Sequence, residues 1–179
     1  MDVMFKRGGM FNELAQKVYC MPGDTRYGYT VWWQGKIVGI AGATLFRWYD
    51  DICHVLEYSG IRRKMVEEGR VAYNNVFFMF RRIPVYPSHV IATFIRTLNR
   101  EWIRETGRRL LAVITTIEPC HAGLSYKHAG FIYAGTVMTR KWMTVDRRCL
   151  SQKMKIFVRL RGGNATIAGG ELLLERFSR

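Results

Sequence analysis

The sequence predicts a single α/β domain. Two β-rich runs, Tyr27–Trp33 and Lys36–Leu45, are separated by Gln34-Gly35, which is typical of a β-hairpin. Behind them, an apolar run, a long amphipathic helix and a second apolar run form a strand–helix–strand pattern. A length of 179 residues and a hydrophobic fraction of 49% suit one domain, residues 1–179, with a sizeable core.

The front half contains helix-compatible segments on both sides of the hairpin. Phe11–Tyr19 can form a short helix, and Cys53–Gly69 has helical spacing and ends at a glycine. Val71–Arg82 follows as a strand. Its nearly continuous apolar centre predicts a central position in the sheet.

The next helix has the clearest signals. Ser88 is expected to cap its N-terminus, directly after Pro87, and Gly107 is expected to end it. Residues at helical spacing form an apolar stripe (Ile91, Ile95, Leu98, Trp102) and a basic one (Arg96, Arg100, Arg104). The remaining expected elements are a strand at Leu110–Ile117, a short helix within Pro119–Ala129, strands at Phe131–Met138 and Lys153–Arg161, and a loop over 162–170.

The net charge of +14 is the strongest compositional signal, because such an excess attracts polyanions. Nucleic acid is the obvious partner, although a basic surface can also serve solubility alone. The basic residues recur along the chain, which suits a folded basic face. The candidates for nucleic-acid contact are Arg62, Arg63, Lys64, Arg147 and Arg148.

The segment Phe46-Arg47-Trp48-Tyr49-Asp50 lies past a strand end and mixes charge with aromatic rings that look exposed. Arg47 and Trp48 could contact an extruded base there, since modification of a base requires flipping it out of the stack. The alternative is that these rings belong to the core.

Cysteine and histidine give little sign of a metal centre. The four cysteines are scattered without a Cys-x-x-Cys pair, so we expect reduced, mostly buried thiols and neither a zinc site nor a disulfide framework. The four histidines show no recognised ligand spacing, and ligands of any bound metal are expected to come from distant segments.

A bend with the sequence Arg81-Arg82-Ile83-Pro84-Val85-Tyr86-Pro87-Ser88 precedes the long helix. A helix N-terminus attracts anions such as a pyrophosphate, and flanking arginines add charge-assisted hydrogen bonds. The alternative is an ordinary strand–helix connection. The candidate cofactor-binding residues are Arg81, Arg82, Ile83, Val85, Ser88 and His89.

The segment Tyr126-Lys127-His128-Ala129-Gly130-Phe131, which follows a strand, resembles the closing motif of the GNAT (Gcn5-related N-acetyltransferase) superfamily. The resemblance implies a GNAT-like α/β fold with a mixed, mostly antiparallel sheet, flanking helices and a splayed strand pair that holds acyl-CoA. It places the cofactor-binding core at about 70–140, with a C-terminal strand and tail over 150–179. It also makes Tyr126 a candidate general acid for the leaving thiolate. A half-buried core tyrosine is the alternative.

Two features resemble the Mom-like branch, phage DNA-modification proteins with a GNAT-type core. The loop is RRIPVYPS in place of the usual Gly-rich one, and His121-Ala122-Gly123-Leu124-Ser125-Tyr126 precedes Phe131-Ile132-Tyr133-Ala134-Gly135. This resemblance implies modification of adenine in DNA, which protects phage DNA from restriction, with acetyl-CoA as cofactor and iron as a candidate metal. An acidic residue expected shortly before the His-Gly segment has no clear counterpart.

Two further residues are catalytic candidates. His121 could relay protons or bind a metal, or it could be a hydrogen-bonded structural residue. Glu118 could act as a base at the strand end.

Three functions therefore stay open. They are acyl-CoA-dependent modification of DNA bases, acetylation of a protein or small-molecule amine, and non-catalytic binding of nucleic acid. The sequence lacks both an apolar run near the ~20 residues of a membrane span and an N-terminal apolar h-region. We therefore expect a soluble cytoplasmic protein without membrane contact, in the host cytoplasm if phage-encoded, with a homodimer allowed.

Overall fold

The computed structural model describes residues 3–18, 25–48, 52–143 and 148–161, and for residues 139–143 and 148–152 it describes the backbone alone. Its elements, in chain order, are β1 (Met4–Arg7), α1 (Phe11–Val18), β2 (Tyr27–Trp33), β3 (Lys36–Leu45), α2 (Cys53–Tyr58), α3 (Arg63–Glu67), β4 (Val71–Met79), α4 (Pro87–Thr106), β5 (Ala112–Ile117), α5 (Leu124–His128), β6 (Ile132–Met143) and β7 (Arg148–Leu160).

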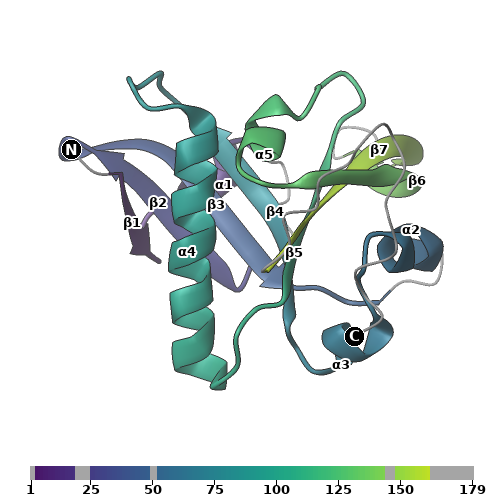
Figure 1. Ribbon diagram of the computed structural model, residues 1–179. Helices are drawn as coiled ribbons and strands as arrows, with labels where there is room; N and C mark the ends of the chain where they lie inside the picture. Colours follow the sequence, from purple (N-terminus) through teal and green to yellow (C-terminus); the bar gives the residue numbers. More distant parts are fainter. Residues whose placement is uncertain (1–2, 19–24, 49–51, 144–147, 162–179) are drawn as a thin grey trace.

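The strands form one sheet in the order β1-β2-β3-β4-β5-β7-β6 (Figure 1). Each neighbouring pair is antiparallel except β4 and β5, which run parallel. The predicted mixed, mostly antiparallel sheet is confirmed. So is the central position of the strand that begins at Val71.

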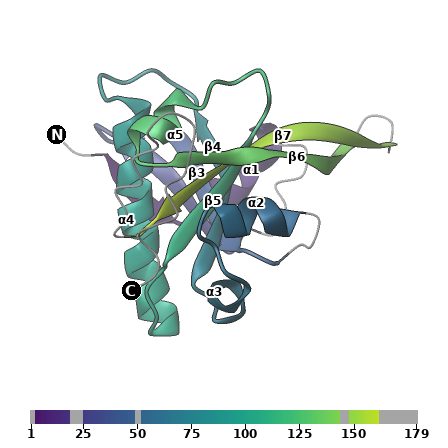
Figure 2. The same ribbon diagram turned by 45° about the vertical axis from the view of Figure 1, so that its right-hand side comes forward.

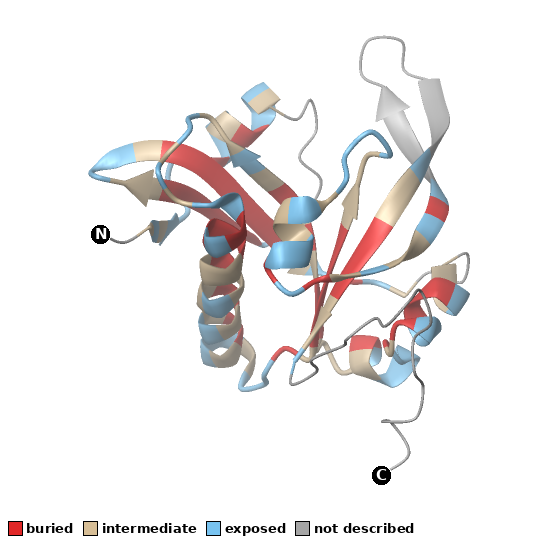
Figure 3. Ribbon diagram, turned by 45° about the horizontal axis from the view of Figure 1, so that its top comes forward, coloured by how far each residue is buried: buried red, intermediate tan, exposed pale blue. Residues whose placement is uncertain are grey.

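Helices cover both faces of the sheet (Figures 1 and 2). Successive side chains of a strand point to opposite faces, so Val71 and Ala72 enter different cores. Ala72 belongs to the core under α4 and α5, whereas Val71 belongs to the core with α2 and α3. Val76 packs with α1 in a third, smaller core. Figure 3 shows the buried residues running through the middle strands and along the inner side of α4.

Helix α4 confirms the predicted stripe. Ile91, Leu98 and Trp102 are buried and Ile95 is half-buried, whereas the three arginines of the basic stripe are exposed. Gly107 ends the helix with φ of 68°, as expected. The predicted cap at Ser88 is wrong, because the helix begins at Pro87 with Tyr86 as N-cap. Proline suits the first helical position, since its fixed φ is already helical, and Ser88 becomes a buried second residue.

Other element boundaries differ from expectation. β1 was not predicted, and Cys53–Gly69 forms two short helices that a turn at Gly60, with φ of 85°, separates. The helix expected within Pro119–Ala129 is confined to α5. β6 and β7 extend further than predicted, as a long hairpin. The expectation of mostly buried thiols is wrong for the two cysteines whose side chains are described, since Cys53 is half-buried and Cys120 exposed.

Among the described residues, no helix combines the length and apolarity needed to cross a membrane. The loop expected over 162–170 and the tail after it lie outside the described residues.

Candidate functional site

The parallel pair β4 and β5 opens into a fork. The two strands pair from Val71 with Ala112 to Asn74 with Thr115. Beyond this point β4 continues along β3 to Met79, while β5 follows β7 to Ile117. The splayed strand pair expected from the resemblance is therefore present, and the fork opens after Asn74.

A β-bulge in β4 lies at the opening of the fork. Val76 pairs with Gly42 and Tyr73 with Thr44, so Asn74 and Asn75 together face a single residue of β3. A bulge bends the strand that carries it and increases its local twist. The sequence around residue 74 thus turns the end of β4 away from β5.

The Asn74 side chain fixes this geometry. It is 2% exposed, and its Nδ2 donates hydrogen bonds to the carbonyl oxygens of Gly42 at 2.7 Å and Val76 at 2.8 Å. From the β5 side, the Thr115 hydroxyl donates to the Asn74 carbonyl at 3.0 Å. A buried polar side chain with several bonds of this kind holds one arrangement of the backbone.

Tyr126 lies at the same point. Its hydroxyl donates to Asn74 Oδ1 at 2.9 Å, and its half-buried ring makes edge contacts with Phe77 and Phe131 at centroid distances of 6.3 and 5.2 Å. The phenol of the predicted general acid therefore sits where β4 and β5 separate. Asn74 was not singled out from the sequence. Its available signal was a pair of asparagines in a central apolar strand, where asparagine is depleted.

The structure explains why a glycine, Gly123, stands three residues before Tyr126. It has φ of 70°, and a Cβ there would lie 2.5 Å from Phe157 Cζ and 2.8 Å from Ile117 Cδ1. Only glycine meets both conditions. The close approach lets the chain turn directly from β5 into α5, and the Phe131 amide then donates to the Tyr126 carbonyl at 3.0 Å.

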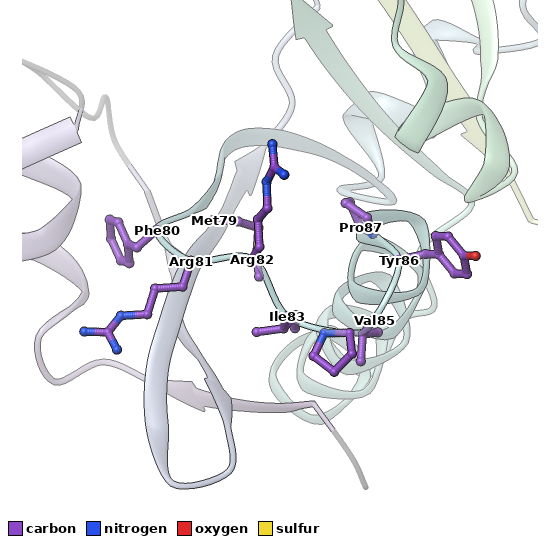
Figure 4. Close-up of a pocket in the computed structure, with 9 residues that line it drawn as sticks. Met79, Phe80, Arg81, Arg82, Ile83, Val85, Tyr86 and Pro87 are labelled. Atoms are coloured by element: carbon purple, nitrogen blue, oxygen red, sulfur yellow. The ribbon is translucent and has the colours of Figure 1, made fainter.

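The predicted anion loop forms a pocket of about 640 Å³ between the end of β4 and the start of α4 (Figure 4). Arg81 and Arg82 are exposed and extend in different directions, while Ile83 and Val85 are half-buried. Of the other predicted cofactor residues, Ser88 is buried and His89 exposed, and neither lines the pocket.

Few backbone donors face an anion at this helix start. Pro87 has no N–H, and the His89 amide donates to the Tyr86 carbonyl at 2.9 Å. Within the described part of the chain, the Ser88 amide has no backbone acceptor. Arginine side chains must therefore supply more of any anion recognition than in a Gly-rich loop.

Glu118 and His121 lie in the loop between β5 and α5. Glu118 is half-buried and His121 exposed, and the His121 amide donates to the Glu118 carbonyl at 3.0 Å. With Cys120 they form a group whose donor atoms all lie within 4.8 Å of one another. This group comes from one short segment, whereas the sequence predicted metal ligands from distant ones.

The residues predicted to contact nucleic acid lie elsewhere. Arg62, Arg63 and Lys64 are exposed at the start of α3, at the opposite end of the sheet from α5 (Figures 1 and 2). Arg47 is exposed and Trp48 half-buried, near the pairing of Leu45 with Ala72 at the start of β4.

The expectation of exposed rings in this segment is wrong for Phe46, which is buried, and Trp48 packs against the same core. Tyr49, Asp50 and Arg147 lie outside the described residues, as does the side chain of Arg148.

An ion-pair cluster joins β1 to α4. Arg7 donates to Glu105 and, at 3.4 Å, to Glu101. The hydrogen bond from Arg7 holds the pKa of Glu105 below its ordinary value, and burial raises the pKa of the neighbouring Tyr27 to about 12. The cluster fixes α4 against the first strands of the sheet.

The sequence matches no known family model and no curated protein. The fold, by contrast, is similar to solved acetyltransferases. A spermidine N-acetyltransferase chimera from Vibrio cholerae and hSSAT aligns with a TM-score of 0.52 and 11% identity over 89% of this chain and 96% of that one. An N-acetyltransferase from Staphylococcus aureus Mu50 aligns with a TM-score of 0.51 and 8% identity, over 89% and 99% of the two chains.

The aminoglycoside acetyltransferase AAC(6')-Ib in complex with coenzyme A and kanamycin aligns with a TM-score of 0.50 and 12% identity over 89% of this chain and 95% of that one. In three other alignments to AAC(6')-Ib, with TM-scores of 0.44 to 0.48, this chain covers 64–66% of that chain. The likenesses with TM-scores of 0.50 to 0.52 show that the chain has the fold of the GNAT acetyltransferases.

Proposed function

We propose that this protein binds an acyl-coenzyme A in the fork between β4 and β5 and transfers the acyl group to an amine of a small molecule or protein. The observation that carries the proposal is the coincidence of three features. The strand pairing ends at Asn74, the Tyr126 hydroxyl lies on Asn74, and a pocket opens where β4 leads into α4.

The fork suits the elongated arm of the cofactor. Where β5 has turned away, β4 no longer pairs with it, and backbone N–H and C=O groups along this edge can form hydrogen bonds with a bound ligand. The amides of a pantetheine arm can provide them. Its pyrophosphate then falls near the start of α4, where Arg81 and Arg82 offer positive charge.

Tyr126 acts as the general acid in this proposal. The amine attacks the thioester carbonyl, the C–S bond breaks as the tetrahedral intermediate collapses, and the leaving sulfur takes the phenolic proton. The phenolate regains a proton from water, and the proton of the attacking amine also passes to water. An unperturbed tyrosine, with a pKa of about 10, suits donation of a proton to a thiolate.

The acceptor is the less defined half of the reaction. Two of the similar structures are a spermidine N-acetyltransferase and an aminoglycoside acetyltransferase bound to kanamycin, and both substrates carry primary amines. We therefore place a primary amine first among the candidate acceptors.

Modification of a DNA base is the second candidate, which the net charge of +14 and the Mom-like residues favour. The basic residues at the start of α3 lie at the far end of the sheet from the fork, so they are poorly placed to grip a duplex whose base enters it. A DNA acceptor would need phosphate contacts closer to Arg81 and Arg82.

The test measures release of free coenzyme A from acetyl-CoA in the presence of spermidine, an aminoglycoside, a lysine peptide or DNA, with mass spectrometry of each acceptor. Acetylation of an amine supports the first proposal. An adduct on adenine nucleosides with unchanged amines supports the second. Failure of acetyl-CoA to raise the melting temperature at millimolar concentration would sink both.

Tyr126→Phe tests the assigned acid. We expect kcat to fall about 10²- to 10⁴-fold with little change in acetyl-CoA affinity, as for loss of general acid catalysis. The matched control is Tyr133→Phe, because Tyr133 is an exposed tyrosine whose hydroxyl bonds Thr136 at 2.6 Å. Equal activity of the two variants would remove Tyr126 from the mechanism.

A further inference from the structure

Three metal-binding side chains gather in the loop between β5 and α5. Glu118, Cys120 and His121 each offer one donor atom, and these atoms lie within 4.8 Å of one another. The Cys120 sulfur is 3.9 Å from a carboxylate oxygen of Glu118. A carboxylate, a thiol and an imidazole thus converge from within four successive residues of the chain.

The backbone of this loop is held in place. Lys155, on β7, donates from its Nζ to the carbonyls of Pro119 at 2.7 Å and His121 at 2.9 Å. Gly123 closes the segment against Phe157. Cys120 and His121 are exposed, so an ion can reach them without unfolding the loop. A site with a fixed backbone and accessible donors loses little entropy when the ion binds.

We infer that Glu118, Cys120 and His121 form a Zn²⁺ site with an open fourth position. Zn–S and Zn–O bonds of about 2.3 and 2.0 Å at a tetrahedral angle place sulfur and oxygen about 3.5 Å apart. The observed 3.9 Å is a few tenths longer, a difference that small side-chain rotations can close. Three protein ligands with the fourth position left to water or another small ligand are the arrangement of zinc sites that are open to solvent.

The donor types select zinc. Magnesium and calcium prefer oxygen ligands alone, and the common iron triad needs two imidazoles and a carboxylate, whereas this cluster has one imidazole and a thiolate. Charge also matters in a chain of net charge +14. A thiolate and a carboxylate bound to Zn²⁺ together neutralise its charge.

The site lies beyond the fork on the β5 side. The pairing of β4 with β5 ends at Thr115, and Glu118 is three residues further on, about 10 Å along an extended chain. Metal ligation takes the place of the acid–base role that the sequence suggested for Glu118 and His121. The inference stands apart from the acyl-transfer proposal, because binding of the metal is measured without acetyl-CoA.

The experiment is a titration with Co²⁺, a coloured substitute for zinc, on the full chain with Cys20, Cys53 and Cys149 replaced by serine. We expect a thiolate-to-cobalt absorption band that saturates at one equivalent and disappears when Zn²⁺ is added. Cys120→Ser should abolish the band, and His121→Ala or Glu118→Gln should weaken binding at least about tenfold. His128→Ala, on exposed α5, is the matched control and should bind as the parent does.

If the serine-substituted parent does not fold, the difference spectrum between the natural sequence and its Cys120→Ser variant gives the same answer. No cobalt band at millimolar metal would overturn the inference. So would a band that survives Cys120→Ser, or equal losses in the His121 and His128 variants.

Discussion

The hydrogen bond between Tyr126 and Asn74 makes a quantitative prediction for stability. Asn74→Ala removes bonds to the carbonyls of Gly42 and Val76 and to the Tyr126 hydroxyl, all at a residue that is 2% exposed. At about 1 kcal/mol for each neutral bond, the free energy of unfolding should fall by about 3 kcal/mol. Tyr126→Phe removes one of the same bonds and should cost about 1 kcal/mol.

The two losses should not add. The double variant breaks the shared bond only once, so it should lose about 3 kcal/mol where additivity gives about 4, a coupling of about 1 kcal/mol. Urea unfolding of the four proteins, followed by circular dichroism and tryptophan fluorescence, measures this cycle. Tyr133→Phe combined with Asn74→Ala is the control pair and should be additive. A coupling below about 0.3 kcal/mol for the Tyr126 pair would show that the phenol does not rest on Asn74 in solution.

Three other variants test separate parts of the structure. Gly123→Ala should lower the free energy of unfolding by about 2–4 kcal/mol in urea, because its Cβ would meet Phe157 at 2.5 Å and its φ of 70° is unfavourable for alanine. The pKa of Glu105 is depressed by Arg7 below the ordinary 4.5, so its stabilisation is present above that value and lost as pH falls through the depressed pKa. Glu105→Gln should therefore give a shallower loss of stability below pH 4.5 in urea titrations at several pH values. Arg82→Ala should raise the Kd for acetyl-CoA about tenfold in calorimetry, as loss of a charge-assisted bond to the pyrophosphate.

Each of these variants has its own check. Gly107→Ala also has a positive φ, 68°, but meets no atom within 4 Å, so it isolates the backbone contribution. A cost equal to that of Gly123→Ala would reject the steric argument. For the pH dependence of stability, Arg7→Met should reproduce the shallower loss seen with Glu105→Gln. If stability falls with pH in Arg7→Met as steeply as in the natural sequence, the ion pair between Arg7 and Glu105 is not its cause. For cofactor binding, the control is Arg63→Ala at the far end of the sheet, which should leave the Kd for acetyl-CoA unchanged. A tenfold rise of this Kd in both variants would mean that the assay reports the overall positive charge of the protein and not a contact of Arg82.

Periodicity was enough to predict the elements that pack on a single face. The apolar stripe of α4 buries Leu98 and Trp102 as expected, because helix spacing directly reports which side meets the sheet. The elements and boundaries that were predicted wrongly depend on contacts with residues distant in sequence. β1 has only the residues Met4–Arg7 and no clear alternation, and it is a strand because it pairs with Tyr29–Trp32 of β2.

In the candidate site, too, local sequence predicted some residues, while others depend on contacts between distant segments. The motif around Tyr126 identified a residue at the fork, since its local glycines determine how α5 follows β5. Asn74 could not be selected, because its importance comes from contacts with Gly42 on β3 and Tyr126 on α5, 32 and 52 residues away. The grouping of Glu118 with Cys120 and His121 was missed for another reason. Ligands of any metal were expected from distant segments, whereas the loop before α5 brings three neighbouring side chains together.

The bulge in β4 also shifts the inside–outside phase of the strand. Before it, the even-numbered Ala72 faces the core under α4; after it, the odd-numbered Phe77 and Met79 do. Deleting either asparagine would restore simple alternation and leave Val76 and Phe77 on the faces that they occupy now. The cores would keep their side chains, whereas the bend at which β4 parts from β5 would be lost. The extra residue in this strand therefore serves the opening of the fork and not the packing of the cores.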